Sequence, residues 1–145
     1  MKELKKIIES EGETFGEIYG LLENEIRDLE NTEKQMFLSE YNIKKTGLDL
    51  LINKAYEYLN LITFYTAGPK ECRAWSIINQ SKAPVAAGKI HSDFQKGFIK
   101  AEVIKYSDFV NAGSEDEAKK LGYLKSEGKD YIVEDGDMIH FRYNT

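Results

Sequence analysis

Residues 61–106 read LITFYTAGPKECRAWSIINQSKAPVAAGKIHSDFQKGFIKAEVIKY, and most signals for the fold class lie in this run. β-Branched and aromatic residues concentrate in 61–66 and 72–78, which predicts two strands joined by a short loop. Pro84 suits the first turn of a helix, so we expect a helix over 85–94. Two strands followed by a helix indicate the start of a small α+β domain.

The pattern continues toward the C-terminus in shorter elements. We expect a strand over 98–106, a short helix around Phe109 capped by Ser107, a polar helical turn over 115–121, and strands over 131–133 and 138–143. The Asp135-Gly136 pair predicts a tight turn between the last two strands. This element order gives a small mixed sheet with one crossing helix, which is the order of a ubiquitin-like β-grasp domain.

The first 60 residues carry helical periodicity instead, because their apolar residues recur at i, i+3 and i+4. We expect helices over 1–11, 21–29 and 33–40, the last with Thr32 as its N-cap. A stronger helix is expected to begin at Thr46 or Gly47 and to continue through Asn60. The predicted fold class is therefore α+β. A mainly helical region over 1–60 is followed by a β-grasp domain over 61–145.

The composition fits a folded protein without a membrane segment. The chain has 145 residues, 41% of them hydrophobic, with 20 Lys and Arg against 25 Asp and Glu. No apolar run reaches the ~18–20 residues of a membrane span, and the N-terminus lacks the apolar core of a signal peptide. Cys72 is the single cysteine, which excludes an internal disulfide and fits a reducing compartment. We expect a cytoplasmic protein with no membrane partner.

The sequence contains no motif for nucleotide chemistry, neither GxxxxGK[ST] nor GxGxxG. His91, His140 and Cys72 are too few for a zinc site, which needs about four nitrogen or sulfur ligands. A Cys72–His91 catalytic pair is conceivable, but Cys72 lies in a predicted strand, where a buried thiol is usual. The sequence His91-Ser92-Asp93 is better explained as a helix cap or loop network. We therefore expect no catalytic residue, bound cofactor or metal in this chain.

Charge is spread unevenly, and the middle of the chain is basic. Residues 70–105 hold 7 basic and 3 acidic residues, net +4, within a chain of net charge -5. Aromatic residues such as Trp75 and Phe94 are interleaved with the basic ones, and this combination can neutralise phosphates and stack on unpaired bases. The candidate residues for RNA or ribosome contact are Lys70, Arg73, Lys82, Lys89, His91, Lys96 and Lys100.

The expected contact is a sequence-independent grip on an RNA backbone, without specificity for a DNA sequence. The alternative is a solvated, charged face that has no partner. Under that alternative, Trp75, Phe94 and Phe98 belong to the hydrophobic core, and we expect at least two of them there in either case.

Three segments carry a family resemblance: TFYTAGPKECRAWSI (63–77), KAPVAAGKIHSDFQKGFIKAEVIKYSDF (82–109) and EGKDYIVEDGDMIHFRYN (127–144). They resemble the C-terminal TGS domain of the Obg-like, YchF-type P-loop ATPase/GTPase. Residues 33–61 resemble the helical stretch that precedes this domain in the family. The resemblance implies a TGS domain of β-grasp fold over roughly 61–145.

The resemblance also implies a function. The full-length family hydrolyses ATP or GTP with magnesium and associates with ribosomes and RNA, and its TGS domain is a binding and regulatory module. Residues 1–32 would then be the end of a nucleotide-binding domain whose catalytic motifs lie in a missing N-terminal part, which becomes an expected partner. The alternative is an intramolecular packing domain that completes and regulates that hydrolase domain. Alone, the chain is expected to hydrolyse neither nucleotide.

Overall fold

A computed structural model of the chain describes residues 2–11, 17–43, 45–68 and 71–144. The chain divides into two compact units. We call Met1–Leu59 the helical unit and Asn60–Thr145 the sheet unit. Within the described residues, no helix combines the length and the apolar character needed to cross a lipid bilayer.

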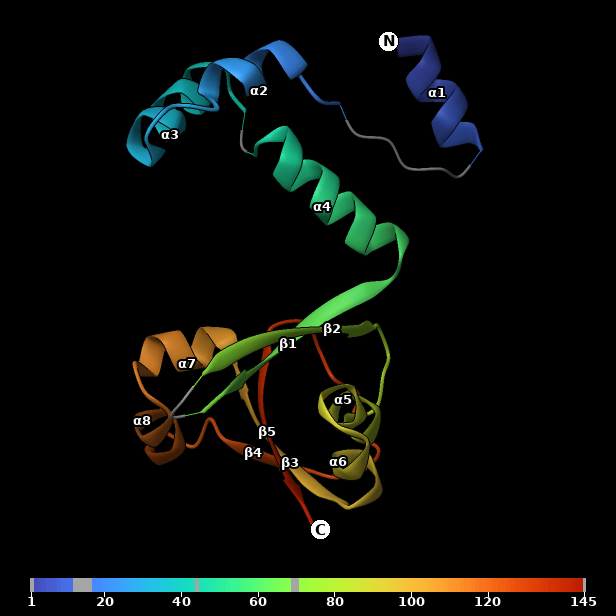
Figure 1. The fold of residues 1–145 in the computed structure, drawn as a ribbon, viewed down its shortest axis with the longest axis vertical. Helices are drawn as coiled ribbons and strands as arrows, with labels where there is room; N and C mark the ends of the chain where they lie inside the picture. The colour runs from blue at the N-terminus through green and yellow to red at the C-terminus, as the bar shows by residue number, and fades with distance from the viewer. Residues whose placement is uncertain (1, 12–16, 44, 69–70, 145) are drawn as a thin grey trace. The chain divides into compact units, whose positions relative to one another are not determined.

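The helical unit consists of short helices. They are α1 (Lys2–Ser10), α2 (Gly20–Ile26), α3 (Asn31–Glu40) and α4 (Gly47–Tyr58), and all are visible in Figure 1. Ile26 and Leu38 are its buried apolar side chains among the described residues. The Gly47 backbone N–H donates a hydrogen bond to the Glu23 carboxylate, which joins the start of α4 to α2.

Helix caps agree with the sequence in one case and differ in another. Thr46 is the N-cap of α4, and its hydroxyl accepts a hydrogen bond from the Asp49 backbone N–H (3.1 Å), as expected. Thr32 was the wrong cap for α3. The helix begins at Asn31, and a capping box between Glu30 and Glu33 satisfies its first backbone N–H groups.

The sheet unit contains a five-stranded mixed sheet in the order β2-β1-β5-β3-β4. Its strands are β1 (Leu61–Ala67), β2 (Cys72–Ile78), β3 (Phe98–Lys105), β4 (Lys125–Glu127) and β5 (Asp137–Tyr143). The central strand β5 is parallel to β1 and antiparallel to β3. This arrangement, with a helix crossing one face, confirms the predicted α+β class and its β-grasp fold.

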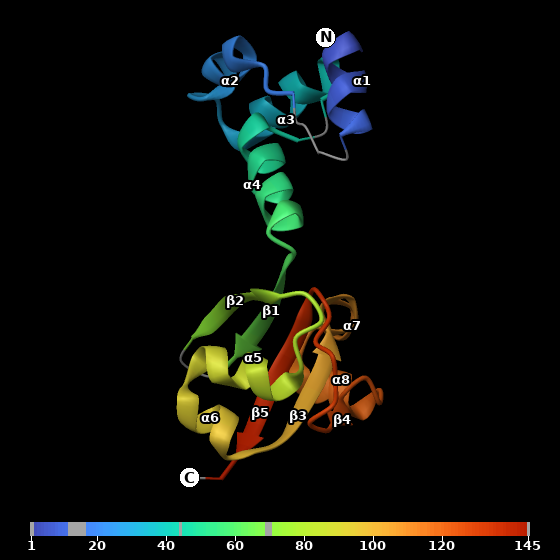
Figure 2. The same cartoon turned by 90° about the vertical axis from the view of Figure 1, so that its right-hand side faces the viewer.

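Short helices cover the two faces of the sheet. On one face lie α5 (Ala83–Ile90) and α6 (Ser92–Lys96), and on the other lie α7 (Tyr106–Ala112) and α8 (Glu115–Lys120), as Figures 1 and 2 show. Pro84 occupies the first turn of α5, as its fixed φ favours. The predicted helix over 85–94 is interrupted at His91, whose extended backbone ends α5 and begins α6.

The hydrophobic core lies between the sheet and α5. Phe64 of β1, Phe141 of β5 and Ala87 of α5 are buried there, and the Phe64 and Phe141 rings meet edge to face at 5.9 Å. Phe98 is also buried, whereas Trp75 and Phe94 are partly buried against this core, in line with the expectation that at least two of these three rings pack inside.

Three predictions about local structure were wrong. Cys72 is exposed rather than buried, because it is the first residue of an edge strand. Ser107 does not cap α7, since that helix already begins at Tyr106. Residues 131–133 do not form a hairpin with β5. Ile132 instead makes an isolated bridge to Lys82, and β4 occupies the sheet edge beside β3.

The Asp135-Gly136 turn is present, but it serves another connection. Gly136 adopts φ +81, the left-handed region that favours glycine. Its N–H donates to the Thr63 carbonyl (2.8 Å), and the Asp135 side chain accepts from the Thr63 N–H (2.8 Å). The turn is therefore fastened to β1, and it delivers the chain into β5.

A buried carboxylate holds the start of β5 in place. Asp137 has no exposed surface, and it accepts hydrogen bonds from Lys105 Nζ (2.6 Å), Tyr131 Oη (2.7 Å) and the Glu134 N–H (2.9 Å). Burial by itself would lower the pKa of Lys105, but the bonds to Asp137, Glu134 and Tyr131 outweigh it and raise that pKa. The Lys105 ammonium thus stays charged and neutralises the buried carboxylate.

Asp137→Ala should destabilise the sheet unit by about 2–3 kcal/mol, because Lys105 would lose its buried partner and the Glu134 N–H its acceptor. Urea unfolding followed by circular dichroism measures this. The control is Asp130→Ala, which removes an exposed ion pair with Lys82 and should leave the midpoint unchanged. Equal midpoints for all three proteins would contradict the assigned role of Asp137.

Stability should also fall in alkaline solution. Burial and the hydrogen bond to Asp137 raise the pKa of Tyr131 to about 12. The unfolded chain loses this proton near pH ~10, so the stability that Tyr131 contributes is present below that pH and lost as pH rises toward ~12. Tyr131→Phe should flatten the decline of the unfolding free energy between these pH values. If the unfolding free energy of Tyr131→Phe declined with pH as steeply as that of the unsubstituted chain, Tyr131 would not be the cause of the alkaline loss of stability.

Candidate functional site

The predicted contact residues are distributed over several elements of the sheet unit. Lys70 lies outside the described residues. The others are Arg73 on β2, Lys82 just before α5, Lys89 in the last turn of α5, His91 between α5 and α6, Lys96 at the end of α6, and Lys100 on β3. They do not form one compact cluster, and their surroundings differ.

Two of these lysines are engaged by carboxylates. Lys82 Nζ lies 2.8 Å from Asp130. Both side chains are mostly exposed, so water competes with this ion pair and the pair is weak. Lys100 lies 2.9 Å from Glu102, which Arg142 also contacts at 2.9 Å. The bonds from Lys100 and then Arg142 lower the pKa of Glu102. This carboxylate therefore neutralises part of the positive charge on the sheet.

The remaining cations are freer. Arg73 and Lys89 have no carboxylate partner in the part of the chain that the structure describes, and Lys96 approaches Asp93 only at 4.0 Å. The His91 ring accepts the Asp93 backbone N–H (3.3 Å), which agrees with the predicted cap, and its Nδ1 atom also lies 3.4 Å from the exposed Asp93 carboxylate. Arg73, Lys89 and Lys96 are thus the cations of this set most available to an anionic partner.

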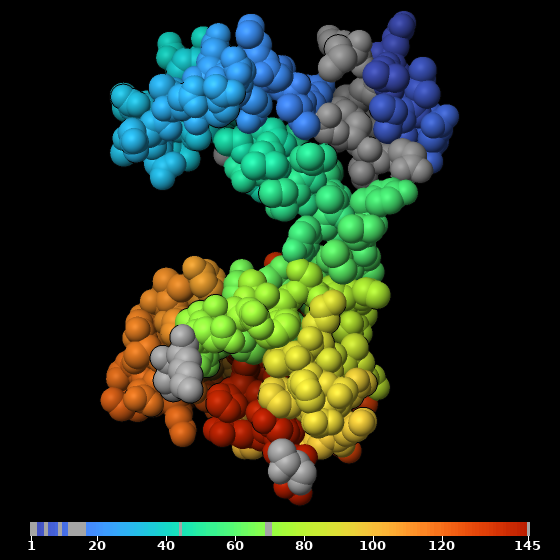
Figure 3. Space-filling view, in the orientation of Figure 1, coloured from blue at the N-terminus to red at the C-terminus, as the bar shows by residue number. Residues whose placement is uncertain are grey.

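A groove lies beside Arg73, between the last residues of β1, the first residues of β2, the second half of β5 and helices α5 and α6. It holds about 920 Å³ of space open to solvent. Its lining includes Glu71, Arg73, Trp75, Phe94, His140 and Tyr143. In Figure 3 the red surface of β5 lies recessed beside the yellow surface of α5 and α6.

The groove exists because β1 and β5 separate. Their only paired residues among those described are Tyr65 and Met138, although β5 continues to Tyr143. Beyond that pair, β5 remains bonded to β3 but has no ladder with β1 in the part of the chain that the structure describes. The opening beside β1 has residues of the central strand as its floor, namely Ile139, His140, Phe141 and Tyr143.

Aromatic rings and one guanidinium form the groove walls. The Arg73 guanidinium lies over the Trp75 ring, 5.0 Å from its centroid, and Trp75 Nε1 donates to the Thr66 hydroxyl (3.0 Å). On the α6 side, the rings of Phe94 and Tyr143 stack with centroids 3.8 Å apart. Sequence reasoning named Arg73, Trp75 and Phe94. It missed Tyr143, although the alternation in 138–143 places it on the face of Phe141.

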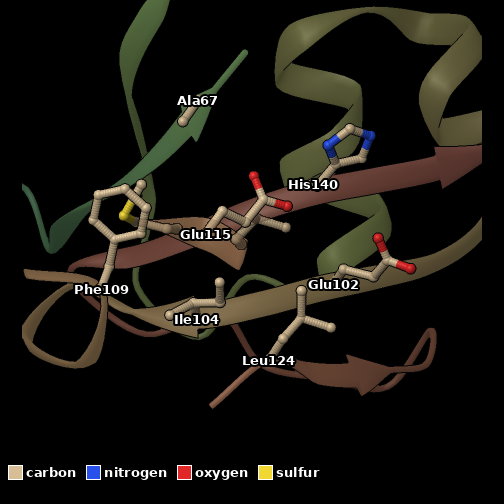
Figure 4. Close-up of a pocket in the computed structure, with 9 residues that line it drawn as sticks. Ala67, Glu102, Ile104, Phe109, Glu115, Leu124 and His140 are labelled. Carbon is tan, nitrogen blue, oxygen red and sulfur yellow. The ribbon is translucent and has the colours of Figure 1, made fainter. Parts of the chain in front are cut away.

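A smaller hollow of about 310 Å³ lies on the opposite face of the sheet, near α7 and α8. Figure 4 shows Ile104, Phe109 and Leu124 on one side of it, with the carboxylates of Glu102 and Glu115 and the His140 ring around them. Its acidic rim does not suit a phosphate. Among the described residues, no group of three or more His, Cys, Asp or Glu side chains is placed to hold a metal ion.

The fold defines a class, a β-grasp domain, and this one carries a groove lined by cationic and aromatic side chains. The family model YchF-GTPase_C, described as a protein of unknown function (DUF933), matches residues 61–144. Because this match covers more than half of the chain, the chain belongs to the YchF GTPase family and corresponds to its C-terminal region.

Individual relatives agree with this assignment. The chain is 51% identical over 124 residues to the ribosome-binding ATPase YchF of Bacillus subtilis, covering 86% of this chain and 34% of the relative. It is 46% identical over 145 residues to the protein of the same name from Buchnera aphidicola subsp. Acyrthosiphon pisum, covering all of this chain and 40% of the relative. The chain thus spans about two fifths or less of the length of these relatives.

Solved structures support the fold. The Schizosaccharomyces pombe YchF GTPase matches with a TM-score of 0.83 at 33% identity, over 97% of this chain and 38% of that one. A GTP binding protein from Pyrococcus horikoshii OT3 matches with a TM-score of 0.50 at 19% identity, over 90% of this chain and 32% of that one. The second likeness bears on the fold alone.

The groove wall can be tested through Thr66. Thr66→Val should lower the free energy of unfolding by about 1 kcal/mol, because the partly buried Trp75 Nε1 group loses its acceptor. Thr63→Val is the matched control, since it makes the same change on the other face of the same strand, and it should have little effect. Urea unfolding monitored by Trp75 fluorescence compares the two. Equal effects would show that the Trp75 hydrogen bond does not stabilise the wall.

Proposed function

We propose that this chain is a ribosome-binding module, and that its sheet unit makes the contact through the cations around α5, α6 and β2. The observation that carries the proposal is the 42–51% identity to proteins named ribosome-binding ATPase YchF, over regions that include nearly all of this chain. Arg73, Lys89 and Lys96 are the proposed contacts, because carboxylates engage them least. Lys82, His91 and Lys100 are secondary ones.

The proposed ligand is ribosomal RNA, contacted mainly through its phosphates. Lysine and arginine side chains that replace condensed counterions give binding that weakens as salt rises and that reads little sequence. The basic segment is positive although the whole chain has a net charge of -5. The acidic remainder would limit indiscriminate binding to nucleic acid and favour contact through one face.

We further propose that the ATPase activity named for the relatives, with its nucleotide and magnesium sites, resides outside the region that this chain matches. The helical unit would then be the end of the nucleotide-binding domain. The chain alone should not hydrolyse ATP or GTP, and its action would be in the cytoplasm, where ribosomes are. These statements rest on the names of the relatives and on the sequence, in which no phosphate-binding loop occurs.

A second function, intramolecular packing, has its own support. Helix α4 exposes Leu48 (63%), Leu51 (56%) and Ile52 (48%), which is unusual for side chains of this size on one helix. The nucleotide-binding domain would cover them. Under this alternative the chain completes and regulates the hydrolase and has no ribosome affinity of its own.

Co-sedimentation of the purified chain with ribosomes, at low and at near-physiological salt, tests the proposed contact. Binding should be present at low salt and weaker at the higher salt. Changing Lys82, Lys89 and Lys96 together to Glu should weaken binding at least about tenfold, because three phosphate contacts become repulsive.

The control changes Lys119, Lys120 and Lys125 to Glu, which alters the net charge equally on α8 and β4, and it should bind nearly normally. Equal loss in both triple variants would show that net charge alone decides binding. Absence of binding at both salt concentrations would overturn the proposal in favour of intramolecular packing.

A further inference from the structure

We infer that the groove between β1, β5 and α6 receives an unpaired base of single-stranded RNA. This inference deepens the proposed function and rests on it, since it names the part of an RNA partner that the groove recognises. Three features of the groove support it: its stacking surfaces, the open edge of its floor, and the position of its charges.

The stacking surfaces come from two walls. Arg73 lies over Trp75 on the β2 side, and a guanidinium plane as well as an indole ring can stack on a base. On the α6 side, the Tyr143 ring stacks on the Phe94 ring, and Tyr143 keeps 36% of its surface exposed. Stacking on such rings tolerates every base, because each base has a π face.

The floor supplies polar groups. Beyond Met138 the central strand has no β1 partner among the described residues, so backbone groups of β5 border the groove instead of a neighbouring strand. A base that enters between the walls brings edge donors and acceptors to these groups. The floor and walls together thus offer both of the interactions by which proteins hold splayed-out bases.

The charged side chains favour a base inside the groove and phosphates outside it. Glu71 lines the groove together with Arg73 and His140, and its carboxylate disfavours a phosphate inside. A neutral base meets no such penalty. Lys89 and Lys96 on α5 and α6 lie outside the lining, where they can face the flanking phosphates. The groove itself has a volume of about 420 Å³, which has room for one nucleotide and not for a duplex.

The single tryptophan makes this inference measurable. Trp75 is the only tryptophan in the chain and lies in the groove wall, so its fluorescence reports occupancy directly. A single-stranded oligoadenylate titrated into the full chain should quench Trp75, and added salt should weaken the effect. The same strand annealed to its complement should quench much less, because its bases are already paired and stacked.

Variants separate the groove from general charge. Arg73→Gln and Tyr143→Leu should each weaken oligoadenylate binding about tenfold, because each removes a stacking surface. Tyr143→Phe keeps the ring and should bind normally. This control shows whether the Tyr143→Leu effect comes from the missing ring. Arg27→Gln and Tyr58→Leu make matched changes at exposed sites of the helical unit and should have no effect.

The outcomes distinguish this inference from the proposed function. Salt-sensitive ribosome binding without quenching by oligoadenylate would overturn the groove inference and leave ribosome binding intact. Equal quenching by the duplex would overturn the preference for unpaired bases. Quenching by an extended peptide of alternating valine and glutamate, with none by RNA, would replace the inference with strand addition along β5.

Discussion

The buried carboxylate of Asp137 is the constraint on which the sheet unit depends. A carboxylate without exposed surface is tolerated only if it is neutralised and fully hydrogen-bonded, and Lys105, Tyr131 and the Glu134 N–H meet that requirement. These partners come from the end of β3 and from the segment that leads to the Gly136 turn. Satisfying one charge thereby fixes where β5 begins and which strands flank it.

The position of β5 in turn creates the groove. The strand enters the sheet beside β1, but among the described residues it pairs with β1 only at Tyr65 and Met138, while its pairing with β3 runs along nearly its whole length. The edge left open is walled by Trp75 on one side and Phe94 on the other. The groove therefore results from incomplete sheet pairing among the described residues, and it opens on the α5 face of the sheet, beside core residues such as Phe141.

Some cations of this unit are held by carboxylates of the protein, and others remain available to an anionic partner. Lys105 is held by a buried acid, and Lys100 shares Glu102 with Arg142, so these charges are largely neutralised inside the protein. Arg73 and Lys89 lack such partners among the described residues. Sequence counting gives all of them equal weight, and the difference in availability is what focuses the proposed RNA contact on β2, α5 and α6.

Local signals in the sequence were enough to predict the α+β class, the strands 61–66 and 72–78, and the Thr46 cap, because strand composition and capping depend on neighbouring residues. Long segment matches were enough for the family. The pairing of 131–133 with residues near Lys82 and the addition of β4 were decided by tertiary structure, since short strands choose partners by burial across the whole fold. The same holds for the groove: Arg73 and Tyr143 are seventy residues apart, and only the separation of β1 from β5 makes them line one opening.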